Sequence, residues 1–96
     1  MKITAKNFEL TDTLKDYVEK RLSNLDKYFD GVMGVEVVFF EQRGRYTGEL
    51  IVRAKGRTMK AQTTDKDILK VVDDLKEIIT KELRRYKERI KGHRKS

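Results

Sequence analysis

The chain has 96 residues, a length that allows one domain with one hydrophobic core. It carries 23 lysines and arginines against 16 acidic residues, a formal net charge of +7, and it has no cysteine, which excludes a disulfide framework and thiolate chemistry. No apolar run approaches the roughly 20 residues of a membrane span, and the N-terminus lacks a signal-peptide core, so we expect a cytoplasmic protein without a membrane partner.

The N-terminal third predicts a strand followed by a helix. Residues 2–8 alternate in polarity, with Ile3 and Ala5 on one side, as in a half-buried strand. Thr11 is suited to cap a helix over about residues 12–28, because its hydroxyl can accept a hydrogen bond from a free backbone N–H group. The apolar stripe of this helix consists of Leu14, Val18, Leu22, Leu25 and Phe29.

Three strands are predicted in the middle of the chain. Residues 35–40 are β-branched or aromatic and look apolar on both faces, which suits a central strand. Gly44 and Gly56 lie in two tight turns that bound a second strand, over residues 46–55. The third strand, residues 58–63, is short and more polar, which favours a position at the edge of a sheet.

A long helix is predicted over about residues 66–91. Thr64 with Asp67 three residues later matches a helix-start pattern, Asp65 is an alternative cap, and Gly92 is expected to end the helix. At ~1.5 Å per residue the helix is roughly 40 Å long, so its C-terminal end is expected to project from the core. Its apolar face consists of Ile68, Val72, Leu75, Ile79, Leu83, Tyr86 and Ile90.

The resulting order, β-α-β-β-β-α, predicts an α+β domain. A strand-helix-strand start implies a parallel pair with a right-handed crossover, and the two short connections that follow imply an antiparallel meander. Because each helix has one apolar stripe, both are expected to pack on one face of a four-stranded mixed sheet. We assign the domain to residues 1–92 and a basic tail to residues 93–96.

The positive charge is concentrated at the end of the chain. From Lys81 onward the chain holds eight basic residues and two glutamates, whereas the first eighty residues hold 15 basic and 14 acidic residues. Interaction with the helix dipole explains two or three such cations but not eight, so the pattern favours a polyanionic partner, nucleic acid above all. If the helices pack side by side, one basic stripe is expected from Lys20, Arg21, Lys27, Lys81, Arg84, Arg85 and Lys91.

The sequence carries no recognisable signal of catalysis or metal binding. His93, the one histidine, lies in the basic tail, where a solvated role is expected. The acidic pairs at 65/67 and 73/74 are better explained by helix capping and by a solvated helix face. No phosphate-binding loop, dinucleotide fingerprint or nucleophile elbow occurs, so we expect no enzyme, cofactor, metal or small-molecule substrate.

Side chains on the strands leave two other interactions open. Tyr46 follows Arg43-Gly44-Arg45 in the hairpin and is a candidate for stacking on a base, although packing on the sheet is the favoured interpretation. Val38, Phe40 and Ile51, where exposed, would provide a surface for self-association. A protein-interaction module is therefore kept as an alternative function.

The sequence resembles a known family along nearly its whole length. Residues 3–14 are similar to the family's first strand and helix entry, and residues 17–29 to its first helix. Residues 67–73, Asp-Ile-Leu-Lys-Val-Val-Asp, stand where the family has Asp-Met-Tyr-x-Ala-Ile-Asp, with Leu69 in place of the aromatic, and residues 81–91 match its basic helix end. This is the family of bacterial ribosome hibernation factors, which includes the hibernation-promoting factor and the ribosome-associated inhibitor.

The resemblance implies a βαβββα fold and binding to 16S rRNA of the 30S ribosomal subunit, in the mRNA–tRNA channel near the decoding centre. It implies that translation is inhibited under stress or in stationary phase, with a possible partner protein for ribosome dimerisation. Both the short form and the N-terminal domain of a long form remain open. The predicted rRNA-binding residues are Lys20, Arg21, Lys27, Lys81, Arg84, Arg85, Lys87 and Lys91.

One further alternative concerns the kind of RNA. The β-β-β-α portion has nearly the element order of double-stranded-RNA-binding domains. A module for structured or double-stranded RNA that is not restricted to ribosomes therefore stands beside the ribosomal hypothesis. Binding to naked RNA as tight as binding to 30S subunits would favour it.

Overall fold

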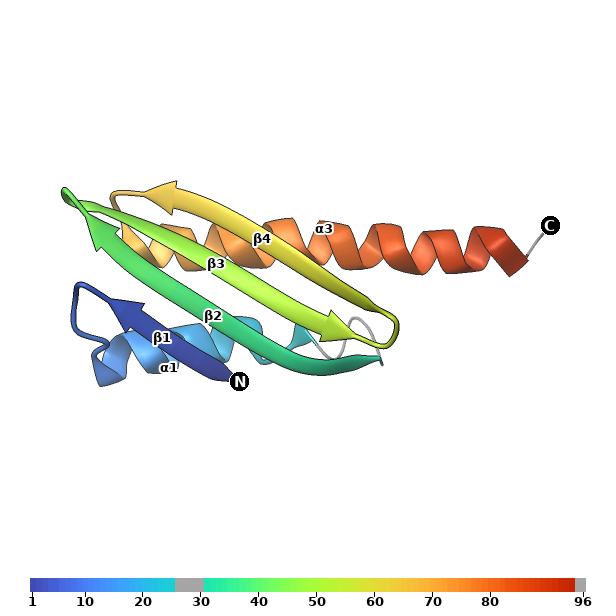
Figure 1. Ribbon diagram of the computed structural model, residues 1–96, viewed down its shortest axis with the longest axis horizontal. Helices are drawn as coiled ribbons and strands as arrows, with labels where there is room; N and C mark the ends of the chain where they lie inside the picture. The colour runs from blue at the N-terminus through green and yellow to red at the C-terminus, as the bar shows by residue number, and fades with distance from the viewer. Residues whose placement is uncertain (26–30, 95–96) are drawn as a thin grey trace.

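The structure, a computed structural model, describes residues 1–25 and 31–94, with side chains up to residue 85. The predicted order β-α-β-β-β-α is confirmed (Figure 1). The elements are β1 (Lys2–Lys6), α1 (Asp12–Leu22), β2 (Val32–Gln42), β3 (Arg45–Ala54), β4 (Arg57–Asp65) and α3 (Ile68–Arg94).

The strands form one mixed sheet in the order β1-β2-β3-β4. β1 runs parallel to β2, while β2 with β3 and β3 with β4 form antiparallel hairpins. Gly44 and Gly56 take positive φ angles of 80° and 78° in the two turns, a conformation that glycine adopts without steric cost. The strand order makes β2 an interior strand and β4 an edge strand, as the sequence predicted.

Both helices pack on the same face of the sheet, and the strands lie in front of them in Figure 1. Side chains of alternate strand residues, Phe39 on β2 and Leu50 and Val52 on β3 among them, fill the space between the layers. The predicted stripes are confirmed, since the stripe residues that the structure describes are buried, apart from a half-buried Ile68. Val71, which the prediction left out, is also fully buried.

Gly48 lies on β3 beneath α3 and determines how closely the helix approaches the sheet. A Cβ atom at this position would lie 2.6 Å from Cγ1 of Val71 and 2.8 Å from Cδ1 of Leu75. Real Cβ atoms essentially never show contacts under 3.0 Å. The hydrogen in place of a side chain therefore allows α3 to pack directly on the strand backbone.

The two helix starts are capped differently from each other. The hydroxyl of Thr11 accepts a hydrogen bond from the backbone N–H of Leu14 at 3.2 Å, which confirms the predicted cap of α1. At α3 the predicted caps are wrong, because a carboxylate oxygen of Asp67 accepts from the N–H of Leu69 at 3.0 Å. Asp65 instead accepts from the N–H of Asp67 at 2.9 Å, and Thr64 belongs to β4.

Several predicted boundaries also differ. β1 ends at Lys6 because Asn7 takes a positive φ of 68°, which ends the extended conformation. α1 ends at Leu22, and residues 26–28 of its predicted continuation lie outside the described residues. α3 passes through Gly92 and ends at Arg94, since glycine costs a helix only ~1 kcal/mol relative to alanine and the chain has no proline to stop it.

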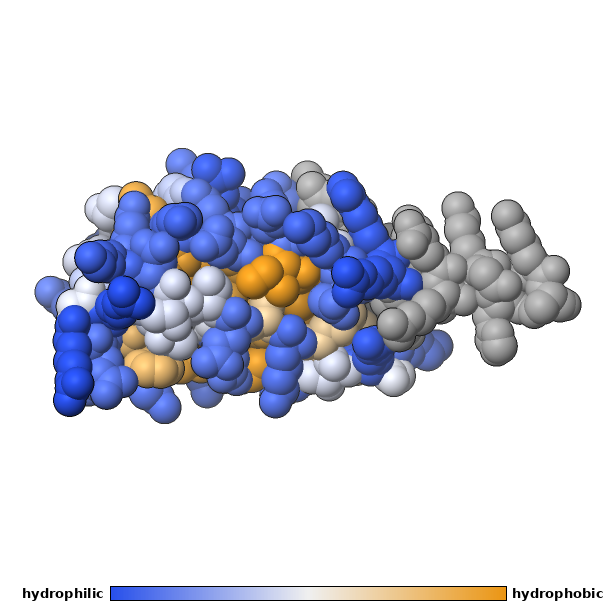
Figure 2. Space-filling model, turned by 90° about the horizontal axis from the view of Figure 1, so that it is seen from above, coloured by the Kyte–Doolittle hydropathy of each residue, from blue (hydrophilic) through white to orange (hydrophobic). Residues whose placement is uncertain are grey.

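The molecule is elongated, with extents of 50 × 21 × 18 Å. α3 extends past the end of the sheet, as its predicted length required (Figure 1). From above, hydrophilic side chains cover most of the surface, and a small hydrophobic area remains near the middle (Figure 2). The candidate site lies on the polar surface of the two helices.

Candidate nucleic-acid interface

A groove of 460 Å³ separates α1 from α3 on the side of the helices that faces solvent. Arg21 of α1 forms one wall, and side chains of α3 form the other. The groove is predominantly cationic. Its lining consists of Arg21, Asp73, Lys76, Glu77, Thr80, Lys81 and Arg84.

Three side chains tie the two helices together at one end of this groove. The Tyr17 hydroxyl donates a hydrogen bond to a carboxylate oxygen of Asp73 at 2.8 Å, and Nε of Arg21 lies 3.3 Å from the same oxygen. The guanidinium carbon of Arg21 also lies 5.3 Å from the centroid of the Tyr17 ring. The Tyr17 hydroxyl, and secondly the Asp73 carboxylate, raise the pKa of the Arg21 guanidinium above its ordinary value.

The charges in the groove do not cancel. The carboxylate of Asp73 is paired with Arg21, and an Oε1–Nζ distance of 3.2 Å pairs Glu77 with Lys81 one helical turn away. Lys76 and Arg84 have no acidic partner among the described side chains. Because exposed ion pairs contribute only ~0–1 kcal/mol, an incoming phosphate can compete with the two carboxylates for their cations.

The structure brings three of the predicted rRNA-binding residues together in this groove, namely Arg21, Lys81 and Arg84. Lys76 belongs with them but was missed, because the charge argument considered only the chain from Lys81 onward. Its position was available in the sequence, since residues 76, 80 and 84 follow one another at the i, i+4 spacing of a helix face. The helical period was therefore the signal that could have found it.

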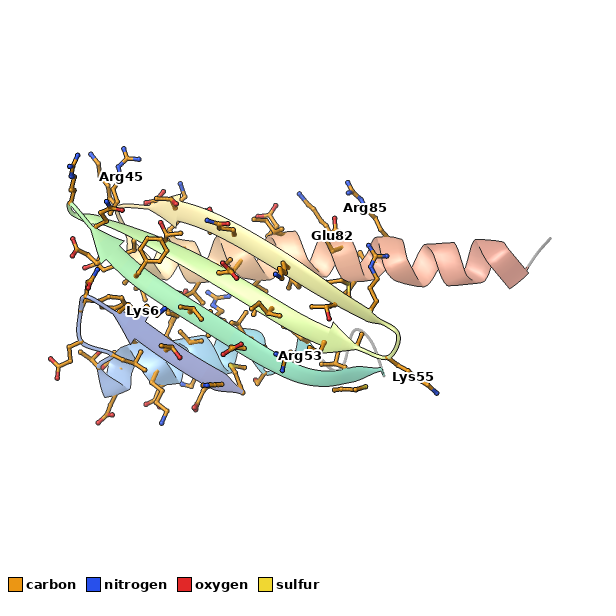
Figure 3. The ribbon with its side chains drawn as sticks, viewed as in Figure 1. Lys6, Arg45, Arg53, Lys55, Glu82 and Arg85 are labelled. Atoms are coloured by element: carbon orange, nitrogen blue, oxygen red, sulfur yellow. The ribbon has the colours of Figure 1, made fainter. Side chains whose placement is uncertain are left out.

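The other predicted residues do not join the groove. Arg85 points away from α1, and its Nη1 lies 3.3 Å from Oε1 of Glu82 (Figure 3). Lys20 lines a separate depression with Tyr17 and Leu69. Lys27 lies outside the described residues, as do the side chains of two further predicted contacts within α3, Lys87 and Lys91.

Tyr46 packs on the domain, as the favoured interpretation predicted. Its half-buried ring lies edge-on to Phe8, with 5.2 Å between ring centroids and an interplanar angle of 76°. Phe40, by contrast, projects from the opposite face of the sheet, because it and Tyr46 occupy positions of opposite parity in paired strands. The aromatic ring that sequence reasoning singled out for stacking is therefore on the core side.

The part of the chain that the structure describes holds no group of three or more His, Cys, Asp or Glu side chains arranged to bind a metal. Among the same residues, no helix is both long and apolar enough to cross a membrane. The acidic pair Asp65/Asp67 serves the start of α3, and Asp73 contacts Tyr17 and Arg21. The four cations that line the groove offer a surface for anions.

Comparisons with known proteins show which family and which relatives the chain is similar to. A family model described as sigma 54 modulation protein / S30EA ribosomal protein matches residues 1–91. The ribosome hibernation promoting factor of Escherichia coli (strain K12) is 26% identical over 93 residues, 97% of this chain and 98% of that protein. The ribosome hibernation promotion factor of Lactococcus lactis subsp. cremoris is 34% identical over 95 residues, 92% of this chain and 49% of that protein.

The fold also occurs in a solved structure. The N-terminal domain of Protein Y from Thermus thermophilus superposes with a TM-score of 0.81 at 30% sequence identity. The match covers 88% of this chain and 94% of that domain. The similarity includes the two helices and the sheet, which together position the groove.

Proposed function

This chain belongs to the sigma 54 modulation protein / S30EA ribosomal protein family, and on that premise we propose that it is a ribosome hibernation factor. Its action is to bind 16S rRNA of the 30S subunit in the mRNA–tRNA channel near the decoding centre and so to inhibit translation under stress or in stationary phase. The names of its relatives support the hibernation role. The cytoplasm is the proposed site of action.

The observation that carries this proposal is the cationic groove between α1 and α3. Four cations from two rigid helices converge there, and both carboxylates of the groove are already paired. Arginine and lysine at fixed spacing on helices suit the phosphates of folded RNA, whose backbone and shape provide most contacts. The groove therefore supports binding to an RNA surface rather than to a base sequence.

The mechanism that we propose is occupancy and involves no catalysis. A preformed domain 50 Å long fills a path that mRNA and tRNA would otherwise use, while the groove holds it against rRNA. Because the described helices and sheet are formed before binding, little ordering entropy is expected to oppose it. A partner protein for ribosome dimerisation would then act on ribosomes that are already blocked.

Co-sedimentation with purified 30S subunits over a salt series tests the proposal. If four groove cations neutralise four phosphates, affinity is expected to fall roughly 100-fold between 50 and 200 mM salt, a logarithmic slope of about −3 to −4. Saturable binding that tRNA and mRNA compete away supports occupancy of the channel. Equal affinity for naked structured RNA would instead support the general RNA-binding alternative, and failure to bind at low salt would contradict the proposal.

Replacing Asp73 with asparagine is expected to strengthen 30S binding roughly fivefold. The change removes a negative charge from the groove and leaves Arg21 available for a phosphate, an effect comparable to one added phosphate contact. Asp74→Asn is the matched control, because it changes the net charge equally at the next position, outside the groove lining. Filter binding at 100 mM salt measures both variants, and an equal gain from the two would contradict a specific role for Asp73.

A further inference from the structure

The face of the sheet that points away from the helices is a second surface with the chemistry of a nucleic-acid contact. Strand alternation and register place every second side chain on this face. No described helix packs over it, and it faces the viewer in Figure 3. Its residues are Lys2, Thr4, Lys6, Glu36, Val38, Phe40, Gln42, Arg45, Thr47, Glu49, Ile51, Arg53, Thr58, Lys60, Gln62 and Thr64, together called the open face.

The centre of the open face is apolar. Val38 and Phe40 on β2 and Ile51 on β3 are half-buried by their neighbours alone. Phe40 lies in a cross-strand row between Lys6 of β1 and Thr47 of β3. The phenyl ring is thus presented on a rigid interior strand, with a cation beside it and no carboxylate in its row.

The rim of the open face is cationic. Five lysines and arginines stand on it, against two glutamates, and Glu36 lies within 3.9 Å of Nζ of Lys2. Lys6, Arg45 and Arg53 project from different parts of the face (Figure 3). A half-buried aromatic ring with a cation beside it, on a face whose rim is cationic, attracts an anionic chain that also carries aromatic groups, and this selects single-stranded nucleic acid over a neutral or acidic protein surface.

We propose that the open face binds a single-stranded RNA segment, with one base stacked on Phe40 and the flanking phosphates near Lys6 and Arg45. The proposal goes beyond the groove, because it concerns the other side of the domain and an unpaired RNA strand. The hydroxyl of Thr47, which pairs with Phe40 across the strands, supplies a donor and an acceptor next to the ring, and the hydroxyl of Thr64 lies 2.9 Å from it. The domain would then contact rRNA through its helices and an unpaired strand through its sheet.

Fluorescence anisotropy with a labelled twelve-nucleotide oligouridine measures this contact without the ribosome. Phe40→Leu keeps an apolar side chain but removes the ring, and it is expected to weaken binding about tenfold. Phe40→Tyr keeps the ring and is expected to bind within about twofold of the unchanged chain. Lys6→Glu is expected to weaken binding as well, since it reverses the charge next to Phe40.

Nuclear magnetic resonance titration locates the same oligonucleotide. Amide signals of β1, β2 and β3 are expected to shift, and thermal unfolding of each variant verifies that it is folded. Unchanged affinity in Phe40→Leu, or shifts confined to α1 and α3, would overturn the proposal while leaving the groove and 30S binding intact. Sedimentation equilibrium tests whether a second copy of the chain binds the open face instead. A dimer that dissociates in the Phe40→Leu variant would identify a self-association surface and would also overturn the proposal.

Discussion

Arg84→Glu is expected to weaken binding to the 30S subunit about 100-fold, whereas Arg85→Glu is expected to weaken it less than about fivefold. A hydrogen bond to a charged group contributes ~1.5–3 kcal/mol, and reversing the charge adds repulsion from the same phosphate. Both substitutions change the net charge of the protein equally. The difference in affinity between the two variants therefore shows the effect of the position of the arginine on α3, because the effect of net charge is the same in both.

The structure explains why two neighbouring arginines differ. Arg84 lines the groove with Arg21 and Lys81, while Arg85 lies about 100° further round the helix, points away from α1 and contacts Glu82. Both side chains are exposed, so neither substitution is expected to unfold the domain. Co-sedimentation at 100 mM salt distinguishes the variants, and comparable losses from Arg84→Glu and Arg85→Glu would show that the groove is not the contact.

Gly48→Ala is expected to lower the free energy of unfolding by about 1–3 kcal/mol, the usual cost of adding a group to a well-packed core. The new methyl group would overlap Val71 and Leu75, both fully buried, so α3 must shift away from β3 or adopt strained rotamers. A loss of 1 kcal/mol lowers the Tm of a domain this size by ~4–8 °C. Thermal or urea unfolding followed by circular dichroism measures the change.

Gly34→Ala is the matched control for this substitution. Gly34 also lies in a strand, a Cβ there would meet nothing within 4 Å, and its φ angle is not positive. Its replacement is expected to be neutral or to stabilise the domain by up to ~1 kcal/mol, because alanine restricts the unfolded chain more than glycine does. If both variants unfold at the same temperature, close packing of α3 on Gly48 does not limit stability.

The elements were predictable because each depends on a local period. Alternation over a strand and three-to-four-residue steps over a helix are written in the sequence, and so are the turn glycines at positions 44 and 56. The Thr11 cap was predictable for the same reason. The start of α3 was not, because three candidate oxygens lie within four residues and the end of β4 decides which one remains free. Val71 was missed because two adjacent helix positions can both face a sheet.

The candidate site was predictable only in part. The sequence by itself determined the βαβββα order, the apolar stripes and the family, since these follow from residue types at short spacings. The tertiary structure alone decided which cations share a groove. That depends on the rotation of α3 about its axis and on the distance of α3 from α1. Contacts such as Tyr17–Asp73 and the space above Gly48 fix both. It also separated Phe40 from Tyr46, since strand register determines which ring faces solvent.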